Sequence, residues 1–313
     1  MDLHQLRVLR ELADHGSIAA TARALSVTPS AVSQVLASLQ RQFAAPLTHK
    51  RGRSVELTGA GQALAAAAVT VATAMAQAEA SVEAYLEDLS AVVAVSGFHS
   101  AAVTFFPALA AKSAQAGHPP VECVDEDVDR AAFPALTASY DLVVAHRMSH
   151  TRPWPAERVA VVPLLREPMD VAVRADHPLA RRAEVSPDCL AGQSFVATHA
   201  GFSPADLLEV IAASAGRPMH VAHRINDFTT AAAMVAQGGL VALLPRYTAA
   251  PPPGSQVVLR PLSGVRAVRN IDVLMRPEHA LRRGVSVVLE SLRQIAGALV
   301  DSRGAAAGQP PAP

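Results

Sequence analysis

Residues 17–40 read SIAATARALSVTPSAVSQVLASLQ and decide the fold of the first part of the chain. Ser17 is a typical N-cap, and the apolar residues that follow it recur at helical spacing. Thr28 is a second N-cap, and Pro29 takes the first helical position, where a missing N–H costs nothing. The stretch therefore predicts two short helices joined by a tight turn at residues 26–27.

The second of these helices has one apolar and one polar face. The apolar face consists of Val32, Val35, Leu36 and Leu39. The opposite face carries short uncharged polar groups, which suit phosphate oxygens and base edges in the major groove of DNA. The candidate DNA-binding residues of this stretch are Ser17, Thr28, Pro29, Ser30, Ser33, Gln34 and Ser38. A polar face that merely meets water is the competing interpretation.

The flanking segments favour the DNA-binding interpretation. Leucines at positions 3, 6, 9 and 12 predict a supporting helix after Asp2. Residues 46–57 predict two short strands around a glycine turn, a wing whose tip adds Lys50, Arg51 and Arg53 to the candidate DNA contacts. Residues 1–58 carry seven Lys and Arg against four Asp and Glu, although the whole chain is neutral. Such a basic end suits nucleic acid; an ordinary solvated basic loop is the alternative for the wing.

Residues 59–89 predict one long helix with Thr58 as its cap. Apolar residues repeat in a heptad pattern along it: Leu64, Ala68, Val71, Met75, Ala78, Val82, Tyr85 and Leu89. A lone helix with such a seam needs a partner, and a second copy of the chain would supply one. Residues 57–78 carry no charge and could span a bilayer by length, but alanine contributes little transfer free energy, so we expect no membrane partner.

From residue 91 onward, short apolar runs alternate with helical stretches. Strands are predicted at 91–96, 121–124, 141–145, 169–173, 194–198, 221–225, 240–244 and 271–275, and helices at 129–139, 203–214, 229–237 and 278–300. This alternation is typical of parallel sheets covered by helices. The last strand and helix are expected to return to the first unit. Two α/β lobes that the chain crosses twice form a hinged clamshell, whose cleft is the usual place for a ligand.

The chain resembles the LysR-type transcriptional regulators over nearly its whole length. The motifs that carry the resemblance are residues 1–39, LTGAGQAL at 57–64, GFHSAAVTFFPAL at 97–109, DHPLA at 176–180 and VAQGGLVALLP at 235–245. The resemblance implies a winged helix-turn-helix DNA-binding domain (all-α with a small wing), a long linker helix, and an α/β two-lobed effector domain similar to periplasmic binding proteins. The corresponding boundaries are 1–58, 59–89 and 90–302, with lobe I at 90–163 and 268–302, lobe II at 164–267, and a disordered tail at 303–313.

The same resemblance implies a sequence-specific regulator of transcription that works as a homodimer or homotetramer and senses a small molecule, with RNA polymerase as a further candidate partner. Hydroxyls at helix N-termini on both cleft walls suit a carboxylate-bearing ligand. The candidate effector-binding residues are His99, Ser100, His146, Arg147, Thr198, His199, Phe202, Asp227, Phe228 and Thr229. His99, His146, Arg147 and His199 enter from their placement at strand ends, and a solvated or core-satisfied side chain is the alternative for each.

Other classes of function find less support. The sequence lacks GxSxG, HExxH and a glycine-rich phosphate loop, so an enzyme using the cleft is a weaker alternative, and a ligand-insensitive architectural DNA binder is another. We expect no cofactor and no metal, since no third ligand accompanies the paired histidines. Cys123 and Cys189 are far apart in sequence; buried inert thiols are favoured over a redox switch. With no signal peptide at the start, a cytoplasmic location is expected.

Overall fold

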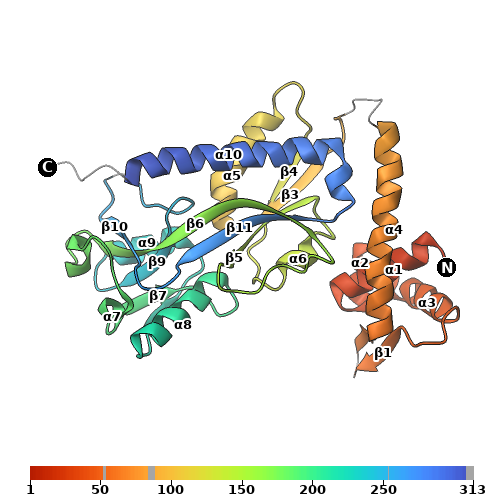
Figure 1. Cartoon of the computed structure of the whole chain (residues 1–313), viewed down its shortest axis with the longest axis horizontal. Coiled ribbons are helices and arrows are strands. Elements are labelled where there is room, and N and C mark those ends of the chain that lie inside the picture. The colour runs from red at the N-terminus through yellow and green to blue at the C-terminus, as the bar shows by residue number, and fades with distance from the viewer. Residues whose placement is uncertain (52–53, 84–88, 253, 308–313) are drawn as a thin grey trace.

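The computed structural model describes residues 1–51, 54–83, 89–252 and 254–307 (Figure 1). The N-terminal part, hereafter the head, consists of helices α1 (Leu3–His15), α2 (Ile18–Ala24) and α3 (Pro29–Gln40), followed by strands β1 (Thr48–Arg51) and β2 (Ser54–Leu57). The two strands pair antiparallel as a wing. Helix α4 (Gly59–Glu83) then leads away from the head. The predicted helix-turn-helix, wing and long helix are therefore present.

Local capping explains the helices of the head. Asp2 and Gln5 form a capping box at the start of α1, and Ser17 and Thr28 accept backbone N–H groups at the starts of α2 and α3. Ser26 adopts a left-handed φ of 53° between α2 and α3, which makes the tight turn. Three helices then share one apolar core. Its main members are Val8, Leu9, Leu12, Ala22, Val32, Leu36 and Leu39.

The junction between wing and α4 depends on two residues of the LTGAGQAL motif. The Thr58 hydroxyl donates to the carbonyl of Pro46 at 2.5 Å and accepts the N–H of Gly61 at 3.1 Å. A Cβ on Gly61 would lie 2.0 Å from the carbonyl oxygen of Leu47, so only glycine fits there. The close approach fixes the direction in which α4 leaves the head.

The effector domain contains two lobes joined by two long strands. Lobe I holds β3 (Val93–Gly97), α5 (His99–Ser113), β4 (Val121–Asp125), α6 (Phe133–Leu136) and β5 (Leu142–Met148). Lobe II holds α7 (Pro187–Leu190), β7 (Ser194–Ala197), α8 (Ser203–Ala215), β8 (His220–Arg224), α9 (Phe228–Ala236), β9 (Val241–Pro245) and β10 (Val257–Pro261), with a 3₁₀ turn at Pro178–Arg181. Strands β6 (Ala160–Arg174) and β11 (Val268–Met275) cross between the lobes. A 3₁₀ turn at His279–Leu281 and helix α10 (Arg283–Ala307) end the described chain; α10 runs lengthwise over the domain (Figure 1).

The strand order is β4-β3-β5-β11-β6-β9-β7-β8, with β10 also paired to β6. Pairing is parallel within β3–β4–β5 and within β7–β8–β9, as predicted, because helices connect those strands. The crossing strands are antiparallel to their neighbours, which corrects the expectation of parallel sheets throughout. Partners of β6 change after Pro168: its first part pairs with β11, and its second part with β9 and β10.

Several predicted bounds are corrected by the structure. The helix expected at 129–139 shrinks to α6, because Pro134 sits in its first turn and the rest of the segment forms turns. Strand β6 begins nine residues before the predicted start at 169, and β10 was not predicted at all. The tail expected to be disordered from 303 starts as helix, since α10 continues to Ala307; residues 308–313 lie outside the described residues. Tyr85 of the predicted heptad pattern also lies outside them.

Candidate functional site

Helix α3 presents an exposed polar ridge on the side opposite its buried residues. Thr28, Pro29, Ser30, Ser33 and Gln34 are all exposed. The Ser33 hydroxyl donates back to the carbonyl of Pro29 at 2.9 Å, and its lone pairs still face solvent. The Gln34 amide extends beyond them and is long enough to reach a base edge. Val32, Leu36 and Leu39 are buried as predicted, and Val35 is half-buried.

The remaining candidate DNA contacts differ in their surroundings. Ser17 is half-buried and caps α2, where helix N-termini commonly meet phosphates. Ser38 is half-buried and accepts a hydrogen bond from Gln5 of α1 at 3.2 Å, so it faces the supporting helix rather than the exposed ridge. Lys50 and Arg51 are exposed on the wing. Arg53 lies outside the described residues.

The acidic side chains of α1 are turned away from the exposed surface of the head. Glu11 bonds Arg276 at 2.8 and 3.0 Å, and Asp14 bonds Arg276 at 2.9 Å and Arg158 at 2.6 Å. Here the charges are reversed: Arg10 of the head pairs with the carboxylate of Glu278, which follows β11, at 2.6 Å. Both arginine partners of the acids belong to the effector domain, so two of the head's four acids are neutralised internally. Among the described residues of the head, the exposed cations are Arg7, Arg23, Arg41, Lys50 and Arg51, and Arg51 lies 3.5 Å from Glu56. These cations outnumber the two remaining acids, Asp2 and Glu56, so the outer surface of the head stays basic.

The second candidate site lies between the lobes, where an inner cavity of about 20 Å³ adjoins an outer cavity of about 330 Å³. The two share His99, Ser100 and Phe228. We call them together the interlobe pocket. Phe98, Ser100 and His146 come from lobe I, and Thr198, Phe202 and Phe228 from lobe II. Residues separated by about a hundred positions thus share one cavity.

A buried polar cluster forms one wall of the interlobe pocket. Arg269 of β11 and Glu167 of β6 are both fully buried and bond through Nη2 and Oε2 at 2.6 Å. The Arg269 Nη2 also donates to the Thr248 hydroxyl at 2.6 Å and to the Ser100 hydroxyl at 3.4 Å. Glu167 receives the backbone N–H groups of residues 247 and 248 at 2.8 and 2.6 Å. The two crossing strands, the segment after β9 and the start of α5 are therefore tied together at the hinge.

Aromatic rings enclose this cluster. The Arg269 guanidinium carbon lies 5.1 Å from the ring centre of Phe98 and 5.6 Å from that of Phe228, one ring from each lobe. The His146 ring packs against Phe98, with centroids 4.3 Å apart. Burial, assisted by the positive charge of Arg269, lowers the pKa of His146 well below 6.5, so this imidazole is neutral at physiological pH.

The Thr198 side chain contributes an open hydrogen-bonding group to the pocket. Thr198 is 6% exposed and lines the inner cavity. Among the residues that the structure describes, no side-chain or backbone group bonds its hydroxyl. A buried hydroxyl without a partner is costly, which a ligand or a water would relieve. Ser100 faces the same cavity from the first turn of α5.

Two family profiles match this chain, one over the head and one over the two-lobed domain. A profile described as "Bacterial regulatory helix-turn-helix protein, lysR family" matches residues 3–62, and one described as "LysR substrate binding domain" matches residues 87–297. Together they cover well over half of the chain. The chain belongs to the LysR family of transcription regulators.

Individual relatives are similar to this chain in sequence or in fold over most of its length. An uncharacterized HTH-type transcriptional regulator, YybE of Bacillus subtilis, is 24% identical over 78% of this chain and 82% of its own length. A probable nitrogen assimilation transcriptional activator of Synechocystis is 25% identical over 80% of this chain and 81% of its own length. A full-length OxyR variant from Pseudomonas aeruginosa matches with a TM-score of 0.62 at 21% identity, over 94% of this chain and 98% of that one. CbnR complexed with its target DNA matches with a TM-score of 0.51 at 18% identity, over 95% of this chain and 100% of that one. These structures share the fold.

The LysR-type architecture accounts for α4, which by composition alone is ambiguous. Residues Gly59–Val82 are long and apolar enough to cross a membrane. Ala65 and Ala68, however, are buried beside α1 in the head, and the helix occupies the linker position between the two matched domains. As a LysR-type protein the chain is a DNA-binding transcription regulator with an effector-binding domain, and not an enzyme.

Most of the predicted effector residues do meet at the interlobe pocket. His99, Ser100, His146, Thr198, Phe202, Asp227, Phe228 and Thr229 line it. Arg147 does not: it lies 3.3 Å from Asp272, beyond both cavities. His199 is exposed, and its backbone N–H donates to the Asn226 side chain at 3.0 Å.

Sequence reasoning missed the residues that build the hinge wall. Arg269 and Glu167 lie just outside the strands predicted at 271–275 and 169–173, so no structural position was assigned to them. Asp127 and Asn226, which also line the inner cavity, were missed as well. A usable signal existed: a charged residue next to a mainly apolar strand is either exposed or paired inside.

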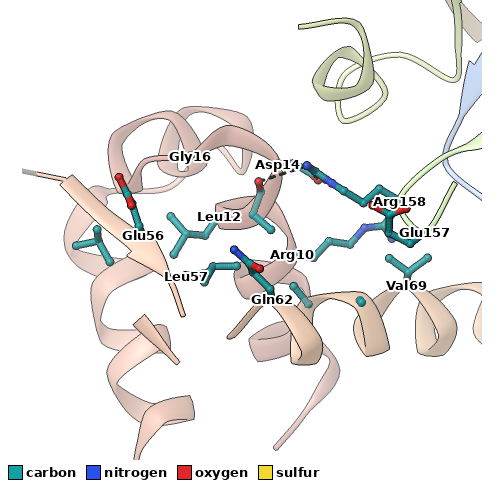
Figure 2. A pocket seen from close by; sticks show the side chains of 14 residues that line it. Arg10, Leu12, Asp14, Gly16, Glu56, Leu57, Gln62, Val69, Glu157 and Arg158 are labelled. Carbon is teal, nitrogen blue, oxygen red and sulfur yellow. Dashed lines mark hydrogen bonds and ion pairs between the residues drawn. The ribbon is translucent and has the colours of Figure 1, made fainter. Parts of the chain in front are cut away.

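A larger cavity lies elsewhere, between α1, β2, α4 and residues 157–158, with a volume of about 530 Å³. Figure 2 shows Arg158 reaching across it to Asp14. Two of its charged side chains, Arg10 and Asp14, are already satisfied by ion pairs between head and effector domain. The smaller interlobe pocket, by contrast, contains the Thr198 hydroxyl, which has no partner among the described residues.

Neither cysteine belongs to a candidate site. Cys123 is on β4 of lobe I and Cys189 on α7 of lobe II, and each packs against a different hydrophobic core. Both thiols are half-buried, which corrects the expectation of buried thiols. Burial raises the pKa of Cys123, which disfavours its reactive thiolate, whereas the hydrogen bond with Ser186 lowers the pKa of Cys189. Within the described ranges, no group of three His, Cys, Asp or Glu is placed to hold a metal ion.

Proposed function

We propose that this LysR-family regulator reads a specific duplex sequence with α3 and that its interlobe pocket binds a small carboxylate-bearing effector. The DNA-binding proposal rests on the exposed ridge formed by residues 28–34 and on the basic wing beside it. Ser33 and the capped start of α3 would position the helix on phosphates, and Gln34 would read a base. Lys50, Arg51 and Arg53 would contact the backbone or the minor groove. The protein would act in the cytoplasm, where its DNA target is.

The observation that carries the effector proposal is the pair of hydroxyls on opposite lobes. Ser100 and Thr198 face one inner cavity, and the Thr198 hydroxyl lacks a partner among the described residues. A carboxylate oxygen accepts hydrogen bonds from both, at a position near the first turn of α5 and beside Arg269. A ligand held by both lobes shifts the equilibrium between open and closed lobes by its differential affinity for the two.

We further propose that α4 pairs with its copy in a homodimer, from which a homotetramer is a second step. Met75 and Val82 are 42% and 65% exposed on the outer half of α4, beyond the part that α1 covers. Two heads joined in this way would contact a DNA site with dyad symmetry. Contact with RNA polymerase, where the regulator activates, would then depend on how the dimer is placed on the promoter.

The test is binding of the purified chain to the DNA upstream of its own coding sequence, followed by nuclease protection and by anisotropy at several salt concentrations. We expect a protected site with two similar halves and an affinity that falls steeply as salt rises. Equal affinity for the upstream region and for scrambled DNA would contradict specific reading. The small inner cavity favours one rival, a ligand-insensitive architectural protein. A metabolite library that never changes the thermal midpoint would support that rival.

A further inference from the structure

The mouth of the interlobe pocket is acidic. Asp125 and Asp127 come from lobe I, and Asp227 caps α9 of lobe II. His99 lies between them, with Nδ1 3.0 Å from Asp125 and Nε2 3.4 Å from Asp227. Two carboxylates thus contact one imidazole, and Asp127 attracts it without a direct contact, so the mouth keeps a net negative charge even when His99 is protonated.

Asp127 is the carboxylate of this group that lines the inner cavity. Its side chain accepts one long hydrogen bond, from Asn226 at 3.5 Å, and no Lys or Arg of the described chain forms an ion pair with it. Partial burial, together with the neighbouring carboxylates Asp125 and Asp227, raises the pKa of Asp127, while Asn226 and His99 act in the opposite direction. Asp127 is therefore attracted by His99 but has no Lys or Arg as an ion-pair partner among the described residues, and an ammonium group placed in the cavity would supply one.

Hydrogen-bond donors are present in the same cavity. The hydroxyls of Ser100 and Thr198 belong to residues that are both more than nine-tenths buried, and that of Thr198 has no partner among the described residues. Arg269 also lines the cavity, and the hydrogen bonds that the structure gives it are made by Nε and Nη2. The cavity thus combines donors suited to an anion with a carboxylate suited to a cation.

We propose that the effector is a small zwitterion that carries both a carboxylate and a protonated amine, as an amino acid does. The carboxylate accepts hydrogen bonds from Ser100 and Thr198, and the ammonium group pairs with Asp127. This inference rests on the proposed effector pocket and adds the charge of the ligand. A dicarboxylate would place its second anion close to Asp127, and a simple monocarboxylate would leave Asp127 without an ion-pair partner. Repulsion between like charges disfavours the dicarboxylate, and the unpaired charge of Asp127 disfavours the monocarboxylate.

Entry of such a ligand requires the lobes to separate, since the inner cavity of about 20 Å³ has room for little more than a water molecule. Three side-chain contacts between the lobes at the mouth are long: 3.4 Å for His99 with Asp227, 3.5 Å for Asn226 with Asp127, and 3.9 Å for Arg130 with Asp206. Contacts of this length are weak. An ammonium group at Asp127 would replace the long bond from Asn226 with a shorter, charge-assisted one.

The experiment measures binding to the purified full-length chain by calorimetry and thermal shift. The probes are the twenty common amino acids and, whether or not the amino acid binds, the 2-hydroxy acid and the amine that carry the same side chain. We also use succinate as a dicarboxylate and Mg²⁺ as a bare cation. The expected result is at least one amino acid that binds at least tenfold more tightly than its 2-hydroxy acid and its amine.

Two variants and one control make the assignment specific. Asp127→Asn should reduce the preference for the amino acid over the 2-hydroxy acid to about onefold, since only the ammonium partner is lost. Thr198→Val, of similar shape, should weaken the amino acid and the 2-hydroxy acid alike. Asp188→Asn, at an exposed position on α7, should change neither. An unchanged preference in Asp127→Asn would overturn the proposal.

The outcomes separate this inference from the proposed function. Tight binding of succinate or of a 2-hydroxy acid, insensitive to Asp127→Asn, would leave the carboxylate pocket standing and refute the zwitterion. Stabilisation by Mg²⁺ alone would also refute it, because Asp127 would then hold a metal ion. If no amino acid, 2-hydroxy acid or dicarboxylate binds, both the carboxylate effector and the zwitterion are wrong.

Discussion

Glu11 on α1 of the head and Arg276 just after β11 of the effector domain form a two-pronged ion pair, with oxygen–nitrogen distances of 2.8 and 3.0 Å. Their residues are only 4% and 9% exposed. Asp14, bonded to both Arg276 and Arg158, extends the pair into a network. This network of paired charges, with Glu11 and Arg276 buried at its centre, fixes direction as well as contact, so these side chains specify the orientation of the head relative to lobe I.

Removing one partner of this pair should be far more harmful than removing both. Arg276→Met leaves the Glu11 charge buried without its main partner, and we expect a loss of about 3–5 kcal/mol in the free energy of unfolding. The double variant Glu11→Leu with Arg276→Met removes both charges and should recover most of that loss. Denaturant unfolding of the wild type, both single variants and the double variant measures the coupling. Simple additivity of the two single losses would show that the pair is not coupled.

The same pair predicts sensitivity to acid. Burial alone would raise the pKa of Glu11, but hydrogen bonds from His15 and Arg276 outweigh it and lower the pKa from 4.5 to about 2. A lowered folded-state pKa means that the stabilisation is complete above 4.5 and is lost as the pH falls toward about 2. The difference in unfolding free energy between wild type and Glu11→Gln should therefore be constant near neutral pH and shrink below 4.5. A difference that stays constant down to pH ~2 would contradict the ion pair.

The head could be predicted from sequence because its signals are local. Ser17, Thr28 and Pro29 mark helix starts within one turn of where they act, and the 3.6-residue pattern of α3 assigns its buried face directly. Ser38 is the exception: its partner Gln5 is 33 residues away, and no local rule turns its hydroxyl toward α1.

The hinge of the effector domain could not be predicted, because long-range pairing defines it. Strand β6 changes partners after Pro168, and its first part is paired by β11, a hundred residues later in the chain. Nothing in the local pattern around Glu167 shows that a strand continues through it. Ser100 and Thr198 entered through the resemblance to LysR-type regulators, which places a hydroxyl after a strand of each lobe. Arg269 was not predicted, because its partner Glu167 lies on another strand.

Gln34 offers a direct test of base reading. Gln34→Ala should lower the preference for the natural site over a site changed at one base pair by about 1–3 kcal/mol, and should leave binding to non-specific DNA nearly unchanged. Lys50→Ala should instead weaken both kinds of binding and reduce the salt dependence. Gln237→Ala, on an exposed position of the effector domain, is the matched control. If Gln34→Ala retains the full preference, another residue of the ridge reads the base.

The exposed half of α4 predicts a self-association surface. Met75→Glu and Val82→Glu place charges on the apolar seam and should weaken dimer formation by more than about tenfold, since each side chain stabilises by about 1.5–3 kcal/mol when buried. Gln77→Glu adds the same charge to an exposed position of α4 that is not part of the seam and should leave the dimer intact. Light scattering over a concentration series gives the dissociation constants. Equal effects of all three changes would place the interface elsewhere.

His99 should make lobe closure depend on pH. The hydrogen bond with Asp125, with further attraction from Asp227 and Asp127, raises the pKa of His99 above 6.5 despite partial burial. Because the pKa of His99 is raised in the folded protein, the stabilisation from its protonated form is complete below pH 6.5 and is lost as the pH rises through the raised pKa. Because Asp227 belongs to lobe II, protonated His99 adds an attraction between the lobes, and small-angle scattering should show a shift toward more open forms of the effector domain as the pH rises through the raised pKa of His99. His99→Gln should remove this change, whereas His150→Gln, at an exposed position in the loop after β5, should retain it. A pH response that survives in His99→Gln would assign the effect to another group.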